Sequence, residues 1–369
     1  MDPKISNVSE EDNVYKFTLS GINVSLANAL RRIILSEIPV VAIKTDEYAT
    51  NQCNIEINTT RLHNEILKQR LSCIPICMGP DELQILPGKY TLEIDMKNET
   101  DDMVFITTEH FKIKNKANGN YLTRDETKRI FPPNKITDDY ILFARLRPKI
   151  SDSIPGEHLK LTAEFCVSSA IEDAKFNVVS NCTYGFTPDM AKVNEMWNEK
   201  ERILKSQDVT QTDISFQKKN FYILDAQRYY VENSFDFTIE SVGCYENRDI
   251  VKQGVSVLND KFGILIKEID ADTFVIKTSE TTMDNCYDII LDNEDYTIGK
   301  ALEYILYLKH YNNDLSVNYC GFIKEHPHDS KSIIRIAFVS KSDKAKVKQY
   351  LRSCLMDAQV VFSNIYKLF

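Results

Sequence analysis

Two stretches near opposite ends of the chain share one helical pattern. Residues 24–39 place apolar side chains at the 3.6-residue period of a helix, and Ser25 stands where an N-cap is expected. Pro39 ends this helix, because its ring disfavours α geometry at the residue before it. Residues 296–306 repeat the pattern, with Thr297 in the place of Ser25 and a constant offset of 272 residues (297 minus 25). The pattern predicts either two unrelated core helices or an internal repeat.

An internal repeat explains more of the pattern, because polar, small and apolar positions all recur in register. Two copies of one unit that pack together have pseudo-two-fold symmetry, like a homodimer joined into one chain. Each helix then presents its apolar face to the other. The residues expected at this pseudo-dimer interface are Leu26, Ala29, Leu30, Ile33, Ile34, Ile298, Ala301, Leu302, Ile305 and Leu306.

The same stretches carry a family resemblance. Residues 26–43 resemble the signature helix of RNA polymerase alpha-type subunits, which include the bacterial alpha subunit and the third subunit of RNA polymerase II. Residues 58–76 are similar to a further helical segment of the third subunit. Residues 294–302 are similar to the opening motif of the eleventh subunit, and residues 321–336 resemble its hairpin and strand. The chain therefore resembles the third and eleventh subunits fused head to tail.

This resemblance implies an α+β fold with two alpha-like dimerisation units packed as an intramolecular pseudo-dimer. A mainly β insert domain is expected within the first unit. The expected boundaries are residues 1–45 plus 179–250 for the first dimerisation domain, 46–178 for the insert domain, and 251–369 for the second dimerisation domain. The length of 369 residues agrees, since it exceeds what one small core supports.

Alternating apolar and polar residues predict strands along much of the chain. The predicted strands are residues 13–21, 40–48, 90–94, 103–106, 141–148, 158–165, 234–243, 264–269, 273–277, 287–291 and 333–339. Besides the repeat helices, the helical period predicts a helix that follows residues 58–60, and helices at residues 188–206 and 342–369. Two polar stretches, residues 112–139 and 206–219, are expected to be loops or flexible.

Composition excludes several classes of protein. Apolar residues make up 43% and charged residues 27%, as in ordinary globular proteins, and no apolar run reaches the length of a membrane span. The net charge of −9 argues against a protein that binds nucleic acid on its own. Residues 1–4 lack the features of a signal peptide, so we expect an intracellular protein, cytoplasmic or nuclear, or packaged in a virion if the source is viral.

Motifs for catalysis and metal binding are absent from the sequence. It contains no Gly-rich phosphate loop, no G-x-S-x-G and no H-E-x-x-H. The nine cysteines are scattered, which favours reduced thiols, and Cys73 and Cys77 have no second pair at a zinc-like distance. Residues 80–115, where relatives often hold zinc, contain no cysteine, and His326 and His328 fit a hairpin loop. We expect no metal, no cofactor and no catalytic residue.

Arg31 and Arg32 lie on the first repeat helix and are predicted to point away from its apolar face. They could form a solvated surface, or a docking point for a large partner, since guanidinium groups fix orientation through bidentate contacts. The family resemblance implies the second role, because this region of alpha-type subunits lies close to the second-largest polymerase subunit.

The resemblance thus implies a non-catalytic assembly platform of a DNA-directed RNA polymerase. Its expected partners are the two largest subunits and small subunits resembling the tenth and twelfth. An interaction scaffold unrelated to transcription is the first alternative. An enzyme with an unrecognised site in residues 46–178 is the second, and it predicts a deep pocket with convergent titratable groups.

Overall fold

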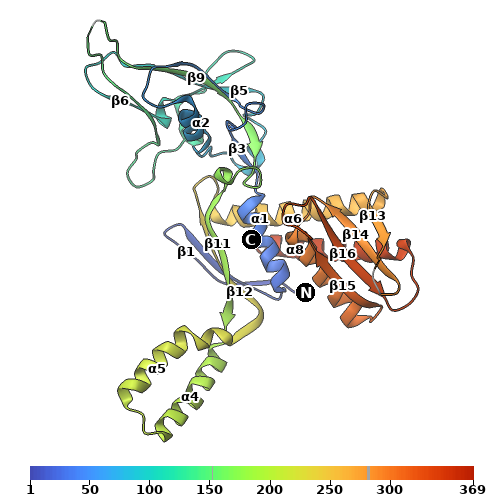
Figure 1. Ribbon diagram of the computed structural model, residues 1–369. Coiled ribbons are helices and arrows are strands. Elements are labelled where there is room, and N and C mark those ends of the chain that lie inside the picture. Colours follow the sequence, from blue (N-terminus) through green and yellow to red (C-terminus); the bar gives the residue numbers. More distant parts are fainter. Residues whose placement is uncertain (152, 281–282) are drawn as a thin grey trace. The chain divides into compact units, whose positions relative to one another are not determined.

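The chain divides into two compact units. The computed structural model describes residues 1–151, 153–280 and 283–369, and many of its elements are labelled in Figure 1. The terminal unit comprises residues 1–33, 181–240 and 254–369, and the insert unit comprises residues 34–180 and 241–253. Both contain helices and antiparallel strands, so the predicted α+β class is confirmed. The terminal unit combines residues from both predicted dimerisation domains, and residues 34–45 and 241–250 group with the insert unit.

The first sheet of the terminal unit has the strand order β1-β2-β12-β11. Its strands are β1 (Lys4–Glu11), β2 (Val14–Ser20), β12 (Tyr230–Ser241) and β11 (Val179–Pro188). Asp12 and Asn13 both have positive φ, as a tight hairpin turn between β1 and β2 requires. Gly21 then leads into α1 (Val24–Ser36) with a φ of 79°. A Cβ at Gly21 would lie 2.0 Å from the Asp2 carbonyl oxygen, so only glycine fits this turn.

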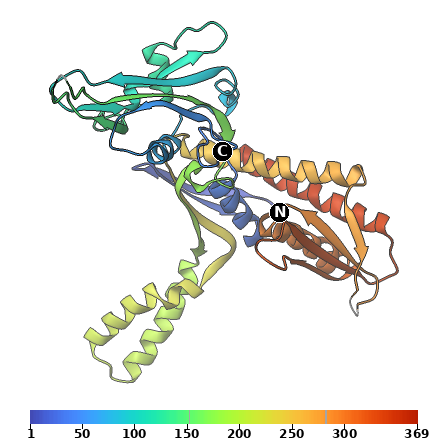
Figure 2. The same cartoon turned by 45° about the horizontal axis from the view of Figure 1, so that its top comes forward.

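The second sheet of the terminal unit has the order β13-β14-β16-β15 and is antiparallel throughout. Its strands are β13 (Val275–Thr278), β14 (Cys286–Asp292), β16 (Lys331–Phe338) and β15 (Val317–Ile323). The helices that accompany it are α6 (Asn247–Asp270), α7 (Tyr296–Leu306), the π-helix η5 (Tyr307–Asn313) and α8 (Lys344–Leu368). Helices α6 and α8 run side by side (Figures 1 and 2), with the rings of Phe262 and Phe362 5.8 Å apart.

A helical hairpin connects β11 to β12 (Figure 2). It consists of α4 (Met190–Ser206) and α5 (Gln211–Ile223), followed by the 3₁₀ turn η4 (Asp225–Arg228). Trp197 of α4 and Phe221 of α5 lie at the centre of a small core of its own, with ring centroids 5.5 Å apart. The hairpin therefore has buried apolar contacts of its own.

The insert unit contains one four-stranded sheet and two strand pairs. The sheet has the order β4 (Cys53–Asn58), β9 (His158–Glu164), β5 (Tyr90–Lys97), β7 (Lys112–Asn115). The pairs are β6 (Val104–Thr107) with β8 (Leu142–Leu146), and β3 (Val40–Ala42) with β10 (Cys166–Ser168). Its helices are α2 (Asn64–Ser72), α3 (Arg124–Ile130) and the 3₁₀ turns η1 (Pro80–Glu82), η2 (Thr108–His110) and η3 (Ala174–Phe176).

Several predicted elements are wrong. Residues 264–269 belong to α6, because Phe262, Leu265 and Ile269 are buried at a helical spacing that a short strand reading overlooks. Most of the predicted flexible stretch 206–219 is the start of α5, whose Ile214 is buried in the hairpin core. The predicted loop 112–139 contains β7 and α3, residues 44–48 are not a strand, and the helix after residue 58 begins only at residue 64.

The close contact between α7 and β15 generates a stability prediction. A Cβ at Gly299 of α7 would lie 2.1 Å from the Phe322 ring of β15, so Gly299→Ala should destabilise the chain by about 1–3 kcal/mol. Gly263→Ala on α6 is the matched control, because its Cβ would meet only the Gln359 amide at 3.3 Å. Helix propensity should leave this control neutral or more stable by up to about 1 kcal/mol. Urea unfolding would measure both, and equal stabilities would contradict the close packing.

Candidate functional site

The N-terminal turns of the two repeat helices are capped in the same way. In α1 the Asn23 side-chain oxygen accepts from the Ser25 N–H at 2.9 Å, and the Asn23 carbonyl accepts from the Ala27 N–H at 3.1 Å. In α7 the Asp295 carboxylate accepts from the Thr297 N–H at 2.8 Å, and its carbonyl accepts from the Gly299 N–H.

The predicted caps Ser25 and Thr297 are therefore wrong by two residues. Asn23 and Asp295, the residues that cap the helices, keep the offset of 272 (295 minus 23). Serine and threonine are also favoured N-caps, so residue type alone did not distinguish Ser25 and Thr297 from the true caps. Asparagine and aspartate are preferred N-caps, so the signal was present two residues earlier.

Arg32 connects the two repeat helices within the terminal unit. Its Nε donates to the Thr297 hydroxyl at 2.8 Å, and its guanidinium forms an ion pair with the Asp295 carboxylate. The Arg32 side chain thus contacts the first turn of α7 within the chain, and its predicted role in docking a partner stays a prediction. The carboxylate lies between the guanidinium and the positive end of the α7 dipole, which would otherwise repel it.

The environment of Asp295 favours its ionised form. Burial raises the pKa of this carboxyl, but hydrogen bonds from Thr297 and the positive charge of Arg32 outweigh burial, so that its pKa is lowered overall. Both side chains of the ion pair are more than a third exposed, at 37% and 38%. The pair is thus a partly solvated contact whose energy salt will reduce.

Arg31 differs from its neighbour. Its Nε donates to the Asn28 side chain of the same helix at 3.0 Å, and among the residues described it has no carboxylate partner. Burial raises the pKa of the Cys182 thiol on β11 to about 12, and the positive charge of Arg31 opposes this rise. Arg31 therefore remains available as a docking residue, whereas Arg32 already has partners within the chain.

The ten residues predicted at the pseudo-dimer interface are all buried, none exposing more than 2% of its surface. They are Leu26, Ala29, Leu30, Ile33, Ile34, Ile298, Ala301, Leu302, Ile305 and Leu306. The chain's last residue provides a second contact between the two predicted dimerisation domains. The Phe369 ring packs edge-on against Phe17 of β2, with centroids 5.0 Å apart.

The cysteines and histidines considered for metal binding are arranged differently from a metal site. Cys73 is exposed, while the thiols of Cys77 and Cys244 are hydrogen-bonded, which lowers the pKa of Cys77 and raises that of Cys244. His326 and His328 lie in an exposed turn, where the His328 N–H donates to His326 Nδ1. Within the described ranges, no three His, Cys, Asp or Glu side chains gather as metal ligands, and no helix is long and apolar enough to cross a membrane.

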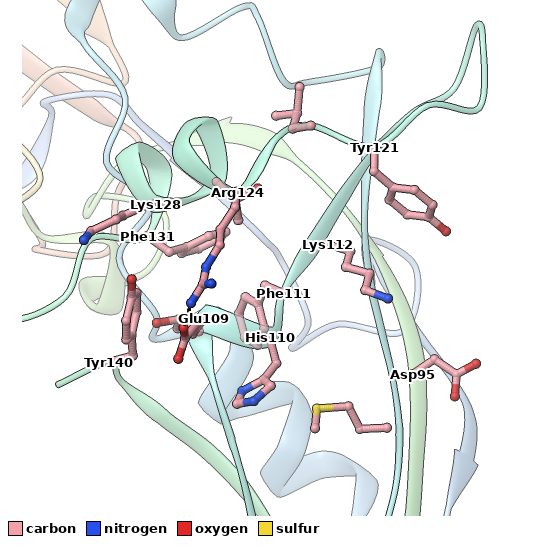
Figure 3. A pocket seen from close by; sticks show the side chains of 14 residues that line it. Asp95, Glu109, His110, Phe111, Lys112, Tyr121, Arg124, Lys128, Phe131 and Tyr140 are labelled. Atoms are coloured by element: carbon pink, nitrogen blue, oxygen red, sulfur yellow. Dashed lines mark hydrogen bonds and ion pairs between the residues drawn. The ribbon is translucent and has the colours of Figure 1, made fainter.

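A pocket of about 650 Å³ lies in the insert unit between β5, η2, β7 and α3 (Figure 3). The alternative hypothesis of an enzyme predicts such a pocket, although no motif in the sequence indicates one. Its two carboxylates are each paired with a basic side chain: Glu109 forms an ion pair with Arg124, and Asp95 contacts His158 at 2.7 Å. Figure 3 shows Asp95 and Glu109 far apart along its wall, so they do not form an acid–base pair.

The Arg32–Asp295 pair generates a prediction for stability against pH. Asp295→Asn keeps a capping side chain but removes the charge, so we expect a loss of about 0.5–1 kcal/mol at pH 7. Because the pKa of Asp295 is lowered in the folded chain, its contribution is present above the unfolded value near pH 4 and is lost as the pH falls through the folded value.

Urea unfolding of both proteins at pH 7 and near pH 3 would test this, and the difference should shrink at the lower pH. Asp189→Asn is the control, since Asp189 caps α4 by accepting from the Lys192 N–H without an arginine partner. A pH-independent difference at Asp295 would contradict a charge-based role.

Comparison with known proteins gives the family. Residues 16–262 match the RNA polymerase Rpb3/Rpb11 dimerisation domain. The chain is 24% identical over 294 residues to DNA-directed RNA polymerases IV and V subunit 3B of Arabidopsis thaliana, covering 68% of this chain and 86% of that protein. It is 26% identical over 308 residues to DNA-directed RNA polymerases I and III subunit rpac1 of Dictyostelium discoideum, covering 72% and 82%. It is 24% identical over 277 residues to DNA-directed RNA polymerase subunit Rpo3 of Archaeoglobus fulgidus, covering 71% and 96%. The chain belongs to the Rpb3/Rpb11 dimerisation-domain family.

Proposed function

We propose that this chain is a non-catalytic subunit of a DNA-directed RNA polymerase, on which the two largest subunits assemble. The relatives are named as subunits of such polymerases, and this chain matches most of the length of each. The observation that carries the proposal is the contact of Arg32 with Asp295 and Thr297, which joins the two repeat helices within one compact unit. As a polymerase subunit the chain works inside the cell, beside small subunits resembling the tenth and twelfth.

The terminal unit, in this proposal, is a third-subunit-like and an eleventh-subunit-like domain fused into a pseudo-dimer. The matched caps and the burial of all ten interface residues support it. Four buried Leu or Ile side chains per helix, at about 1.5–3 kcal/mol each, give an upper bound of about 6–12 kcal/mol per face. That is comparable to the stability of a whole domain, so neither half should be stable alone. Fusion replaces an encounter between two chains by an intramolecular one.

A double-mutant cycle tests whether the two apolar faces meet. Leu30→Ala and Leu302→Ala should each cost about 2–5 kcal/mol, because both side chains are buried. If the two residues share one interface, the double variant should depart from the sum by about 0.5–3 kcal/mol. Leu30→Ala combined with Leu92→Ala in the insert unit is the control and should be additive. Additive costs for Leu30 and Leu302 in urea unfolding would count against direct pairing.

Arg31 provides a test of assembly. Arg31→Glu should leave the melting temperature unchanged, because Arg31 has no acidic partner to lose in the described part of the chain. It should lower the recovery of the two largest polymerase subunits when the tagged chain is co-expressed with them and purified gently, as mass spectrometry would measure. Arg32→Glu is unsuitable, since it places a carboxylate beside Asp295.

Arg202→Glu on α4 is the matched control for that experiment, because Arg202 is exposed and distant from α1 in sequence. If Arg31→Glu recovers as much of the two large subunits as the wild-type chain does, Arg31 is not part of the docking surface. A wild-type chain that recovers neither large subunit would favour the alternative of a scaffold unrelated to transcription.

A further inference from the structure

A groove of about 580 Å³ in the insert unit combines four arginines with an apolar floor. Arg61, Arg70, Arg145 and Arg147 line it, together with apolar residues that include Leu62 and Met103. We call it the arginine groove. All of its lining residues belong to the insert unit, and the proposed assembly role does not account for it.

Three of the four guanidinium groups have no carboxylate partner in the part of the chain that the structure describes. Arg147 is paired with the buried Glu157, whose oxygen also accepts from the Arg147 N–H. Arg70 donates to two main-chain carbonyls, those of Phe143 at 2.7 Å and Leu142 at 2.6 Å. The groove therefore carries a net positive charge in a chain whose net charge is −9.

The other two arginines are exposed. The Arg145 guanidinium lies over the Phe105 ring, 5.5 Å from its centroid, an arrangement that leaves its N–H groups free to donate. Arg61 has no hydrogen bond or ion pair among residues 1–151, 153–280 and 283–369. These two side chains can turn toward a ligand without breaking an ion pair of the folded chain.

We propose that the arginine groove docks an acidic segment of a partner protein. Guanidinium forks bind carboxylates in a bidentate way, and arginine and methionine are enriched at the centres of protein interfaces. Met103 and Phe105 beside the groove expose nearly half of their surface, 47% and 48%, which apolar side chains of the partner would cover. Binding to nucleic acid is disfavoured, because the basic groups surround an apolar floor instead of following a continuous basic track.

The partner is bound through its side chains rather than as an added strand. Strand β8 pairs only with β6 in the described part of the chain, but side chains already occupy several of its carbonyls. Arg70 binds those of Leu142 and Phe143, and the Asn98 amide binds that of Leu146 at 3.0 Å. Few acceptors remain for another backbone, so the segment must supply carboxylates to the arginines and an apolar side chain to the floor.

The experiment uses the full-length chain and a fluorescent peptide of alternating glutamate and leucine, with fluorescence anisotropy as the readout. A second peptide with glutamine in place of glutamate controls for apolar binding, and a duplex DNA of equal charge controls for general anion binding. The wild-type chain should bind the acidic peptide about tenfold more tightly than either control. Failure to do so would overturn the proposal.

Arg61→Glu combined with Arg145→Glu should weaken binding of the acidic peptide by about tenfold or more. Arg202→Glu combined with Arg248→Glu makes the same change in net charge at exposed sites outside the groove, and should leave the affinity within about twofold. Equal losses in the two variants would reduce the effect to net charge, and tighter DNA binding through Arg61 and Arg145 would assign the groove to nucleic acid.

Arg61→Gln combined with Arg145→Gln serves as a milder variant if charge reversal alters the fold, which melting temperatures would reveal. It should still weaken binding, because it removes both positive charges while keeping polar side chains. The groove test does not involve the large polymerase subunits, so its failure would leave the proposed assembly function intact.

Discussion

Each repeat helix of this chain has an apolar face whose exposure to water would cost free energy. The terminal unit depends on the burial of both faces. Leu30 and Leu302 expose 0% and 1% of their surface, so these faces are fully enclosed in one chain. Hydrophobic burial alone does not fix the orientation of one helix relative to another. The contact of Arg32 with the cap of α7 adds a directional constraint, because a guanidinium must meet both a hydroxyl and a carboxylate.

The sequence predicted most of the elements that depend on local period and capping. The long C-terminal helix is an example, since Val347, Leu351, Leu355 and Ala358 are all buried on one face of α8. The α+β class was implied by the family resemblance, and the repeat helices were predicted from the same local periodicity. These elements could be predicted because the spacing of their apolar residues is visible within one short segment of the sequence.

Elements that depend on tertiary contacts could not be predicted in this way. Helix α5 has little apolar periodicity of its own, and it is stabilised by Phe221 packing against Trp197 of α4. The contact of Arg32 with Asp295 joins residues 263 positions apart, which no local pattern reveals. The arginine groove similarly gathers residues from positions 61 to 157. Sequence analysis therefore located the helices of the candidate site, but not the side chain that connects them.

The contact of Arg32 with the N-cap Asp295 has no equivalent between the matching positions of the other half. The position 272 residues after Arg32 is Tyr304, and the counterpart of Asp295 is the neutral Asn23. In a pseudo-symmetric pair, two copies of α1 would set arginine against asparagine, and two copies of α7 would set tyrosine against aspartate. Only the mixed pair forms the ion pair. This difference between the halves therefore favours pairing of unlike halves over pairing of two like halves from separate molecules.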